Sequence, residues 1–275
     1  MHVKRLARIC LCMAVCALLT GCGGKGPDKK KPERNINKNS GEAQFSPLAQ
    51  GDPIAIIDTD RGEIRIRLFP QYAPMAVQNF TGLAQQGYFN GVSFHRIVKD
   101  FVIQSGDASG TGTGGTTVWN GTAYPVEISD AMHHYTGAVG IAHVTGESAG
   151  NASQFYVVQT PKNSVDKTAA DTLTSLGMRK EVVEAYRSIG GAPYLDNLYT
   201  VFAQVYEGME VVDAIGTVKC TESGQPVEPV LIKSVTIATY TVPETAAAAS
   251  DSSSAKAADA DASPAASPAS ADSAA

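Results

Sequence analysis

Short runs of β-prone residues recur through the middle of this chain, and they constrain its fold more than any other feature. The clearest two, at 54–59 and 63–68, flank the turn Asp60-Arg61-Gly62, and charged and apolar residues alternate along the second. This pattern predicts a β-hairpin. Similar runs follow at 92–98, 101–104, 138–142, 155–159, 198–206 and 230–239. We therefore expect a mostly β fold in which an antiparallel sheet closes into a barrel.

Two helices are predicted to cap this barrel. Pro74 opens an amphipathic stretch that stops at Gly87, which is the usual placement of proline and glycine at helix ends, and a shorter helix is predicted at 209–215. A third helical stretch, 165–189, is rich in Ala, Leu, Lys, Glu and Met and interrupts the strand spacing. We interpret it as an inserted segment at about 162–193, and Gly177 leaves open whether it forms one bent helix or two.

The N-terminal residues 1–21 have the composition of a secretory signal peptide. Basic side chains are followed by an apolar run at 9–19 that is too short to span a bilayer. The run ends in Leu19-Thr20-Gly21-Cys22, which resembles the lipobox of bacterial lipoproteins. That resemblance implies cleavage before Cys22 and lipidation of its thiol. Several acyl chains on one residue would anchor the protein stably, so we expect a lipid-anchored protein of the bacterial cell envelope, with the periplasmic side of the outer membrane favoured.

Composition also sets the domain limits. Residues 22–50 are polar and rich in Gly, Lys, Pro and Asn, which predicts a flexible linker after Cys22, and 242–275 is an Ala/Ser/Pro-rich stretch expected to be a disordered tail. One domain at 51–241 remains. Beyond the predicted signal peptide and Cys22 the chain has one further cysteine, Cys220, so no disulfide framework is expected. The net charge of −5 gives no support for a nucleic-acid partner.

The most informative stretch of the sequence runs from Phe94-His95-Arg96 to Gln104-Ser105-Gly106-Asp107. Further blocks follow at Ala142, at Ser153-Gln154-Phe155-Tyr156, and at Tyr194-Leu195-Asp196-Asn197. In content and in order, these blocks resemble the cyclophilin-type peptidyl-prolyl cis-trans isomerases across nearly the whole predicted domain. The resemblance implies a barrel fold and an enzyme that rotates the bond preceding proline, in unfolded or partly folded proteins that contain proline.

The resemblance also implies a set of site residues. Arg96 matches the catalytic position, where a guanidinium would stabilise the twisted amide without any covalent step, and Gln104 matches the residue that supports it. The positions that match the family's substrate-binding surface are Phe101, Val102, Ala142, His143, Tyr156, Tyr194, Leu195 and Tyr199. No metal or other cofactor is implied, and a monomer is expected.

Four of these positions depart from the commonest family pattern. His143 stands where asparagine is frequent, and Tyr199 stands where histidine is common. Tyr156 replaces a pocket phenylalanine, so its hydroxyl needs a hydrogen-bond partner or water. Tyr194 replaces a tryptophan that is common in cyclosporin-sensitive members, and we therefore expect weak cyclosporin binding.

The glycine-rich loop and the histidines could also suggest a phosphate or a metal site. The loop 110–115 contains G-x-G-x-x-G, but β-prone residues rather than a helix follow it, which disfavours phosphate binding. The histidines show no spacing of a zinc site. Strand alternation places Phe94 and Arg96 on one face and His95 on the other.

The alternative function is a catalytically weak binding or chaperone module, tethered at the membrane, in which the groove and the inserted helices hold a protein partner.

Overall fold

The computed structural model describes residues 42–144 and 150–243. The predicted signal peptide, Cys22 with its predicted lipidation, most of the predicted linker and nearly all of the predicted tail lie outside the described residues. Within the described part, no helix is both long enough and apolar enough to cross a membrane.

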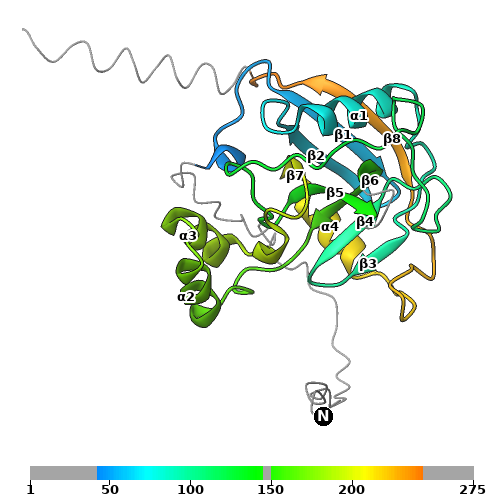
Figure 1. Ribbon diagram of the computed structural model, residues 1–275. Coiled ribbons are helices and arrows are strands. Elements are labelled where there is room, and N and C mark those ends of the chain that lie inside the picture. Colours follow the sequence, from blue (N-terminus) through cyan, green and yellow to red (C-terminus); the bar gives the residue numbers. More distant parts are fainter. Residues whose placement is uncertain (1–41, 145–149, 244–275) are drawn as a thin grey trace, which may run out of the picture. The chain divides into compact units, whose positions relative to one another are not determined.

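Eight strands form one antiparallel sheet in the order β3-β4-β6-β5-β7-β2-β1-β8 (Figure 1). Their bounds are β1 Pro53–Thr59, β2 Gly62–Leu68, β3 Arg96–Val98, β4 Val102–Ser105, β5 Ala138–Val144, β6 Gly150–Val158, β7 Val201–Glu207 and β8 Ile232–Thr239. The predicted mostly β fold with an antiparallel sheet is confirmed. Strand β3 is shorter than the run at 92–98, because the chain before Arg96 joins the sheet only through an isolated bridge between Ser93 and Leu231.

The β1–β2 hairpin follows directly from its sequence. Ile64, Ile66 and Leu68 are buried while Arg65 and Arg67 point outward, as the alternation predicts. Gly62 sits in the turn at φ +128°, and a Cβ there would lie 2.9 Å from Val211. Glycine is therefore needed both for the backbone conformation and for the close approach of the neighbouring helix.

The sheet curls until its two ends meet. The segment just before β3 exchanges backbone hydrogen bonds with the segment that leads into β8: Phe94 N donates to Val230 O over 2.9 Å, and Ile232 N donates to Val92 O over 2.9 Å. Register shifts, which increase local bending, occur in the pairings β1–β8, β2–β7, β5–β6 and β5–β7. These bonds satisfy backbone groups that an open sheet edge would leave unpaired.

Two helices cover the main core, α1 Pro74–Gln85 and α4 Met209–Gly216. Helix α1 has no capping side chain of its own. The Glu127 carboxylate instead accepts from the backbone N–H groups of Met75 and Ala76, at 3.0 and 2.9 Å, which satisfies two groups left free at the helix start. Inside, the ring of Phe80 lies 5.1 to 5.6 Å from three other buried aromatic rings, those of Phe89, Phe155 and Phe202.

The inserted segment forms two helices, α2 Lys167–Ser175 and α3 Lys180–Ile189, which settles the alternative that the sequence left open. The break falls at Gly177, whose φ of +87° is incompatible with a continuous helix. Figure 1 shows both helices beside the sheet, away from α1 in that view. They form a second, smaller core in which Val182, Val183 and Tyr186 pack on Tyr135.

The predicted linker extends too far toward the domain. Residues 43–45 form a short 3₁₀ helix, and Phe45 is only 7% exposed, with its ring 5.0 Å from that of Tyr135 in the second core. Gln44 is also buried: it donates to the backbone oxygen of His133 and accepts from the backbone nitrogen of the same residue. A polar segment without apolar periodicity can be ordered in this way because the partners come from distant parts of the chain.

Candidate active site

Directly paired residues on four neighbouring strands bring the predicted catalytic residues together. Arg96 of β3 pairs with Gln104 of β4, Gln104 pairs with Tyr156 of β6, and Tyr156 pairs with Gly140 of β5. Paired residues in an antiparallel sheet point to the same face. The neighbouring row of Ile97, Ile103 and Val157 is buried in the main core, so the row that contains Arg96 occupies the opposite, outer face of the sheet.

The Arg96 side chain is held by a chain of amide hydrogen bonds. Its Nη1 donates to Oε1 of Gln104 at 3.4 Å, and Nε2 of Gln104 donates to Oε1 of Gln154 at 2.9 Å. Nε2 of Gln154 then donates to the backbone oxygens of Gly112 and Gly114, at 3.1 and 2.7 Å. Among the described residues, no carboxylate forms an ion pair with Arg96. Within the described part of the chain, neutral amide groups therefore orient the guanidinium.

The glycine-rich loop is organised around Asp107, which is 1% exposed. Its carboxylate accepts from the backbone nitrogens of Gly112 and Gly114, at 2.7 and 3.0 Å, and from Ser109. Burial alone would raise the pKa of Asp107, but these hydrogen bonds outweigh it and lower the pKa to about 2. The loop's N–H groups thus already bind an internal anion, which agrees with the sequence argument against phosphate binding.

Beside Arg96, a third apolar cluster covers the outer face of the sheet and surrounds a cavity of about 280 Å³. We call this the outer-face cavity. Val102 and Tyr156 are 2% and 5% exposed and form its base, whereas Phe101, Leu195 and Tyr199 are partly exposed around it. The residues lining it are Arg96, Phe101, Val102, Gln104, Ala142, His143, Tyr156, Leu195 and Tyr199.

The structure therefore brings all but one of the predicted site residues to a single cavity. The exception is Tyr194, whose side chain is 64% exposed and whose ring lies 5.9 Å from that of Phe101. It stands beside the outer-face cavity without lining it. A short 3₁₀ turn, Pro193–Leu195, directs Leu195 toward the sheet while Tyr194 faces solvent.

One side of the cavity is an irregular part of β5. The register of the β5–β6 pair shifts between Ile141 and His143, and β7 pairs with β5 only as far as Gly140. Ala142 and His143 thus line the cavity beyond the paired part of β5 on that side. The His143 ring lies 4.6 Å from the ring of Tyr199, and burial lowers the pKa of His143, so the imidazole is neutral at pH 7.

The predicted alternation was wrong at Phe94. Its side chain is 1% exposed and belongs to the main core with Ile97, while Arg96 faces the outer-face cavity. The reason is that β3 begins at Arg96, so residues 93–95 do not follow the two-residue period of a strand. His95 is buried near the glycine loop and does not line the cavity, and burial lowers its pKa.

Three contributors to this site were not predicted as site residues. Gln154 lies on the same strand face as Tyr156, so alternation along the block 153–156 could have identified it. His134 provides the hydrogen-bond partner that the Tyr156 hydroxyl needs, since its Nε2 lies 2.8 Å from that oxygen. Asp196 contacts the other ring nitrogen of His134. No sequence pattern links residues 134 and 156, because they meet only through the fold. Within the described residues, no three His, Cys, Asp or Glu side chains are grouped to hold a metal.

A family model described as cyclophilin type peptidyl-prolyl cis-trans isomerase matches residues 54–237. The chain belongs to this family. As a cyclophilin-type isomerase it has close bacterial relatives. A Staphylococcus aureus (strain COL) protein named as a peptidyl-prolyl cis-trans isomerase is 35% identical over 190 residues, which are 69% of this chain and 94% of that protein. A Streptococcus pyogenes protein named as a bifunctional phosphatase/peptidyl-prolyl cis-trans isomerase is 37% identical over 187 residues, or 67% of this chain and 38% of that protein.

Solved structures support the fold of this cyclophilin-type isomerase. The crystal structure of a Cryptosporidium parvum cyclophilin type peptidyl-prolyl cis-trans isomerase, determined in the presence of the dipeptide Ala-Pro, aligns with a TM-score of 0.54 at 24% identity. The alignment covers 68% of this chain and 99% of that one. A second crystal structure of the same protein gives a TM-score of 0.54 at 23% identity. The predicted membership of the family, the fold and the class of enzyme are confirmed.

Proposed function

We propose that this enzyme accelerates rotation about X-Pro bonds in exported proteins, with Arg96 as its catalytic residue. The uncatalysed barrier is about 18–20 kcal/mol, because rotation breaks amide resonance. At the twisted geometry the proline nitrogen becomes pyramidal and gains a lone pair. A fixed guanidinium donor binds that nitrogen more strongly than it binds either planar form, which lowers the barrier without covalent chemistry.

One observation carries this proposal: Arg96 shares the outer-face cavity with Phe101, Tyr156 and Leu195 and is held by Gln104. In this proposal the apolar side chains form a socket for a five-membered ring, and the guanidinium lines the same cavity. A hydrogen bond to a charged donor contributes about 1.5–3 kcal/mol. At 1.36 kcal/mol per decade this is about one to two decades of rate, and the rest would come from orienting the peptide and excluding water.

The substrate backbone has a matching place in this proposal. Ala142 and His143 line the outer-face cavity where β7 no longer pairs with β5. An extended peptide pairing there through main-chain groups would be bound largely independently of its sequence, which suits an enzyme that acts on many unfolded clients. The Cryptosporidium parvum structure determined in the presence of Ala-Pro supports a prolyl peptide as the ligand class.

The setting of the reaction is part of the same proposal. The sequence of residues 1–22 supports export and anchoring through a lipidated Cys22, which would place the domain at the surface of a bacterial envelope membrane. Slow X-Pro isomerisation, which takes tens to hundreds of seconds without catalysis, would limit the folding of newly exported proteins there. Proteins with unfolded prolyl segments are therefore the proposed substrates.

A proline-isomerisation assay on a short Ala-Pro peptide tests the function. Arg96→Ala is expected to reduce kcat/KM by about ten- to a hundredfold. Arg61→Ala is the matched control, since Arg61 is an exposed arginine in the β1–β2 turn that pairs with Asp60 and does not line the cavity. Equal rates for the native protein and Arg96→Ala would overturn the catalytic assignment and favour a tethered binding module.

A further inference from the structure

The base of the outer-face cavity includes a residue with a buried hydroxyl. Tyr156 is 5% exposed, and burial, with smaller contributions from Tyr199 and Asp196, raises the pKa of this hydroxyl well above its usual value. The hydroxyl therefore keeps its proton and can donate it. Its acceptor is Nε2 of His134, 2.8 Å away. Because an unpaired buried hydroxyl is costly, this bond fixes the far end of the ring whose face lines the cavity.

Asp196 determines which nitrogen of His134 accepts. The carboxylate oxygen Oδ1 lies 2.8 Å from Nδ1 of His134 and 2.9 Å from the backbone nitrogen of the same residue. Burial alone would raise the pKa of Asp196, but hydrogen bonds from His133 and His134 outweigh it and lower the pKa to about 2. An ionised carboxylate can only accept. Nδ1 of His134 must therefore carry a proton, and in the neutral imidazole this leaves Nε2 free to accept from Tyr156.

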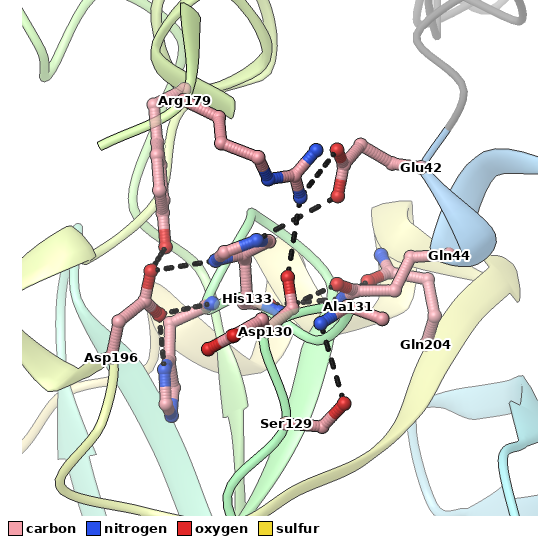
Figure 2. Close-up of polar contacts among 11 residues, drawn as sticks. Glu42, Gln44, Ser129, Asp130, Ala131, His133, Arg179, Asp196 and Gln204 are labelled. Atoms are coloured by element: carbon pink, nitrogen blue, oxygen red, sulfur yellow. Dashed lines mark hydrogen bonds and ion pairs between the residues drawn. The ribbon is translucent and has the colours of Figure 1, made fainter. Parts of the chain in front are cut away.

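Asp196 is itself held on its other side. Oδ2 accepts from the Tyr186 hydroxyl of α3 at 2.7 Å and lies 2.9 Å from Nδ1 of His133. Figure 2 shows how the contacts continue: Nε2 of His133 lies 3.7 Å from the carboxylate of Glu42, which also pairs with Arg179 at 3.1 Å. Helix α3 thus holds the Asp196 carboxylate directly through Tyr186, and Glu42 is linked to it through His133.

Gly140 leaves room in the sheet for the Tyr156 ring. Gly140 lies opposite Tyr156 in the β5–β6 pair, and a Cβ at position 140 would be 2.5 Å from both Cζ and the hydroxyl oxygen of the tyrosine. The ring therefore packs closely against Gly140, with His134 at its hydroxyl end. Its position is defined by contact on one side and by a hydrogen bond at its tip.

From this arrangement we propose that His134, oriented by Asp196, is a positioning residue for the prolyl socket and acts through Tyr156. This inference rests on the proposed function, since it names what shapes the surface that would hold the proline ring. When His134 cannot accept, the Tyr156 hydroxyl must turn toward the socket or bring water into it. Either change makes the socket smaller or wetter, so a prolyl peptide binds less well and turns over more slowly.

Two substitutions of His134 separate its two hydrogen bonds. His134→Gln places an acceptor near the position of Nε2 and keeps the contact with Tyr156. His134→Asn can still donate to Asp196 but is too short to reach the tyrosine. For the Ala-Pro peptide we expect kcat/KM to fall about tenfold in His134→Asn and to stay within about threefold of native in His134→Gln.

A double-mutant cycle with Tyr156→Phe makes the test decisive, because this variant keeps the ring and removes the hydroxyl. In that background, His134→Asn and His134→Gln should both lie within about twofold of the parent. The peptide dissociation constant, measured separately, should follow the same pattern. An equal loss in His134→Asn with and without the Tyr156 hydroxyl would overturn the proposal and leave His134 a purely structural residue.

Tyr186→Phe is the matched control for damage to the polar network. It removes one donor to Asp196 from α3 without touching the cavity. It should lower the melting temperature and reduce kcat/KM by less than His134→Asn does, because Asp196 still contacts Nδ1 and the backbone nitrogen of His134. If the proposed function is wrong, the native protein and Arg96→Ala will turn over the peptide at equal rates. If only the role of His134 is wrong, the native enzyme will be active and the loss of kcat/KM in His134→Asn will be the same with and without the Tyr156 hydroxyl.

Discussion

Gly140→Ala is the substitution that tests the geometry of the outer-face cavity most strictly. Its methyl group would lie 2.5 Å from Cζ and from the hydroxyl oxygen of Tyr156, and 2.8 Å from Cε2. Real carbon contacts are much longer, so something has to move. The φ of Gly140 is not in the left-handed region, and alanine therefore adds a steric effect without backbone strain. The Tyr156 ring cannot move freely, because His134 and the strands hold it.

The expected cost follows from overpacking. One extra methyl group in a well-packed interior typically costs about 1–3 kcal/mol. For a domain of this size each kcal/mol lowers the melting temperature by about 2–4 °C, so we expect a decrease of about 2–12 °C. Displacement of the ring into the socket should also reduce kcat/KM for an Ala-Pro peptide by about tenfold.

The assay is thermal unfolding by circular dichroism together with peptide turnover, on four proteins that form a cycle with Tyr156→Leu. Leucine lacks the ring atoms that the new methyl group would meet. In that background Gly140→Ala should cost less than about 0.5 kcal/mol. A full cost that persists with Leu at 156, or a Gly140→Ala protein with native stability and activity, would refute the packing described here.

Three further predictions concern other parts of the molecule. In the folded protein the pKa values of Asp107 and Asp196 are lowered from 3.8 to about 2, so their contribution to stability is complete above about pH 4 and is lost as the pH falls toward 2. Urea unfolding should show this decline in the free energy of unfolding, and Asp107→Asn should make the decline smaller. A constant free energy of unfolding over that pH range would contradict the prediction. Phe45→Ala should destabilise the domain by about 3 kcal/mol in urea, because the ring is buried in the second core; a change below about 0.5 kcal/mol would mean that residues 43–45 do not pack in solution. Cys22→Ser should move the protein from the membrane to the soluble fraction, and unchanged fractionation would rule out anchoring through this cysteine.

Much of the fold was predictable because it is encoded locally. The alternation at 63–68, the turn at Gly62 and the prolines and glycines at helix ends each act over a few residues. The composition of residues 22–50 predicts a linker and misses the burial of Phe45, because that burial depends on Tyr135 and on α3, which are distant in sequence. Alternation predicts the wrong face for Phe94, because the strand period begins at Arg96, four residues after the start of the β-prone run at 92–98.

The candidate site likewise contains residues that the sequence identifies and residues that it does not. Arg96, Phe101 and Gln104 come from one short stretch, and their resemblance to a known family was enough to identify them. The need of the Tyr156 hydroxyl for a partner could be stated from its residue type. The partner itself, His134 with Asp196 behind it, could not be found by spacing, because three separate segments meet there only after folding.

The central claim is that a positioned guanidinium binds the twisted amide better than the planar one. Exchange NMR on a prolyl peptide at saturating enzyme measures both the bound-state isomerisation rate and the dissociation constant for native protein and Arg96→Ala. We predict that the bound-state rate falls by about ten- to a hundredfold while the dissociation constant changes by less than about threefold. A weaker dissociation constant with an unchanged bound-state rate would contradict the claim and make Arg96 a substrate-binding residue alone.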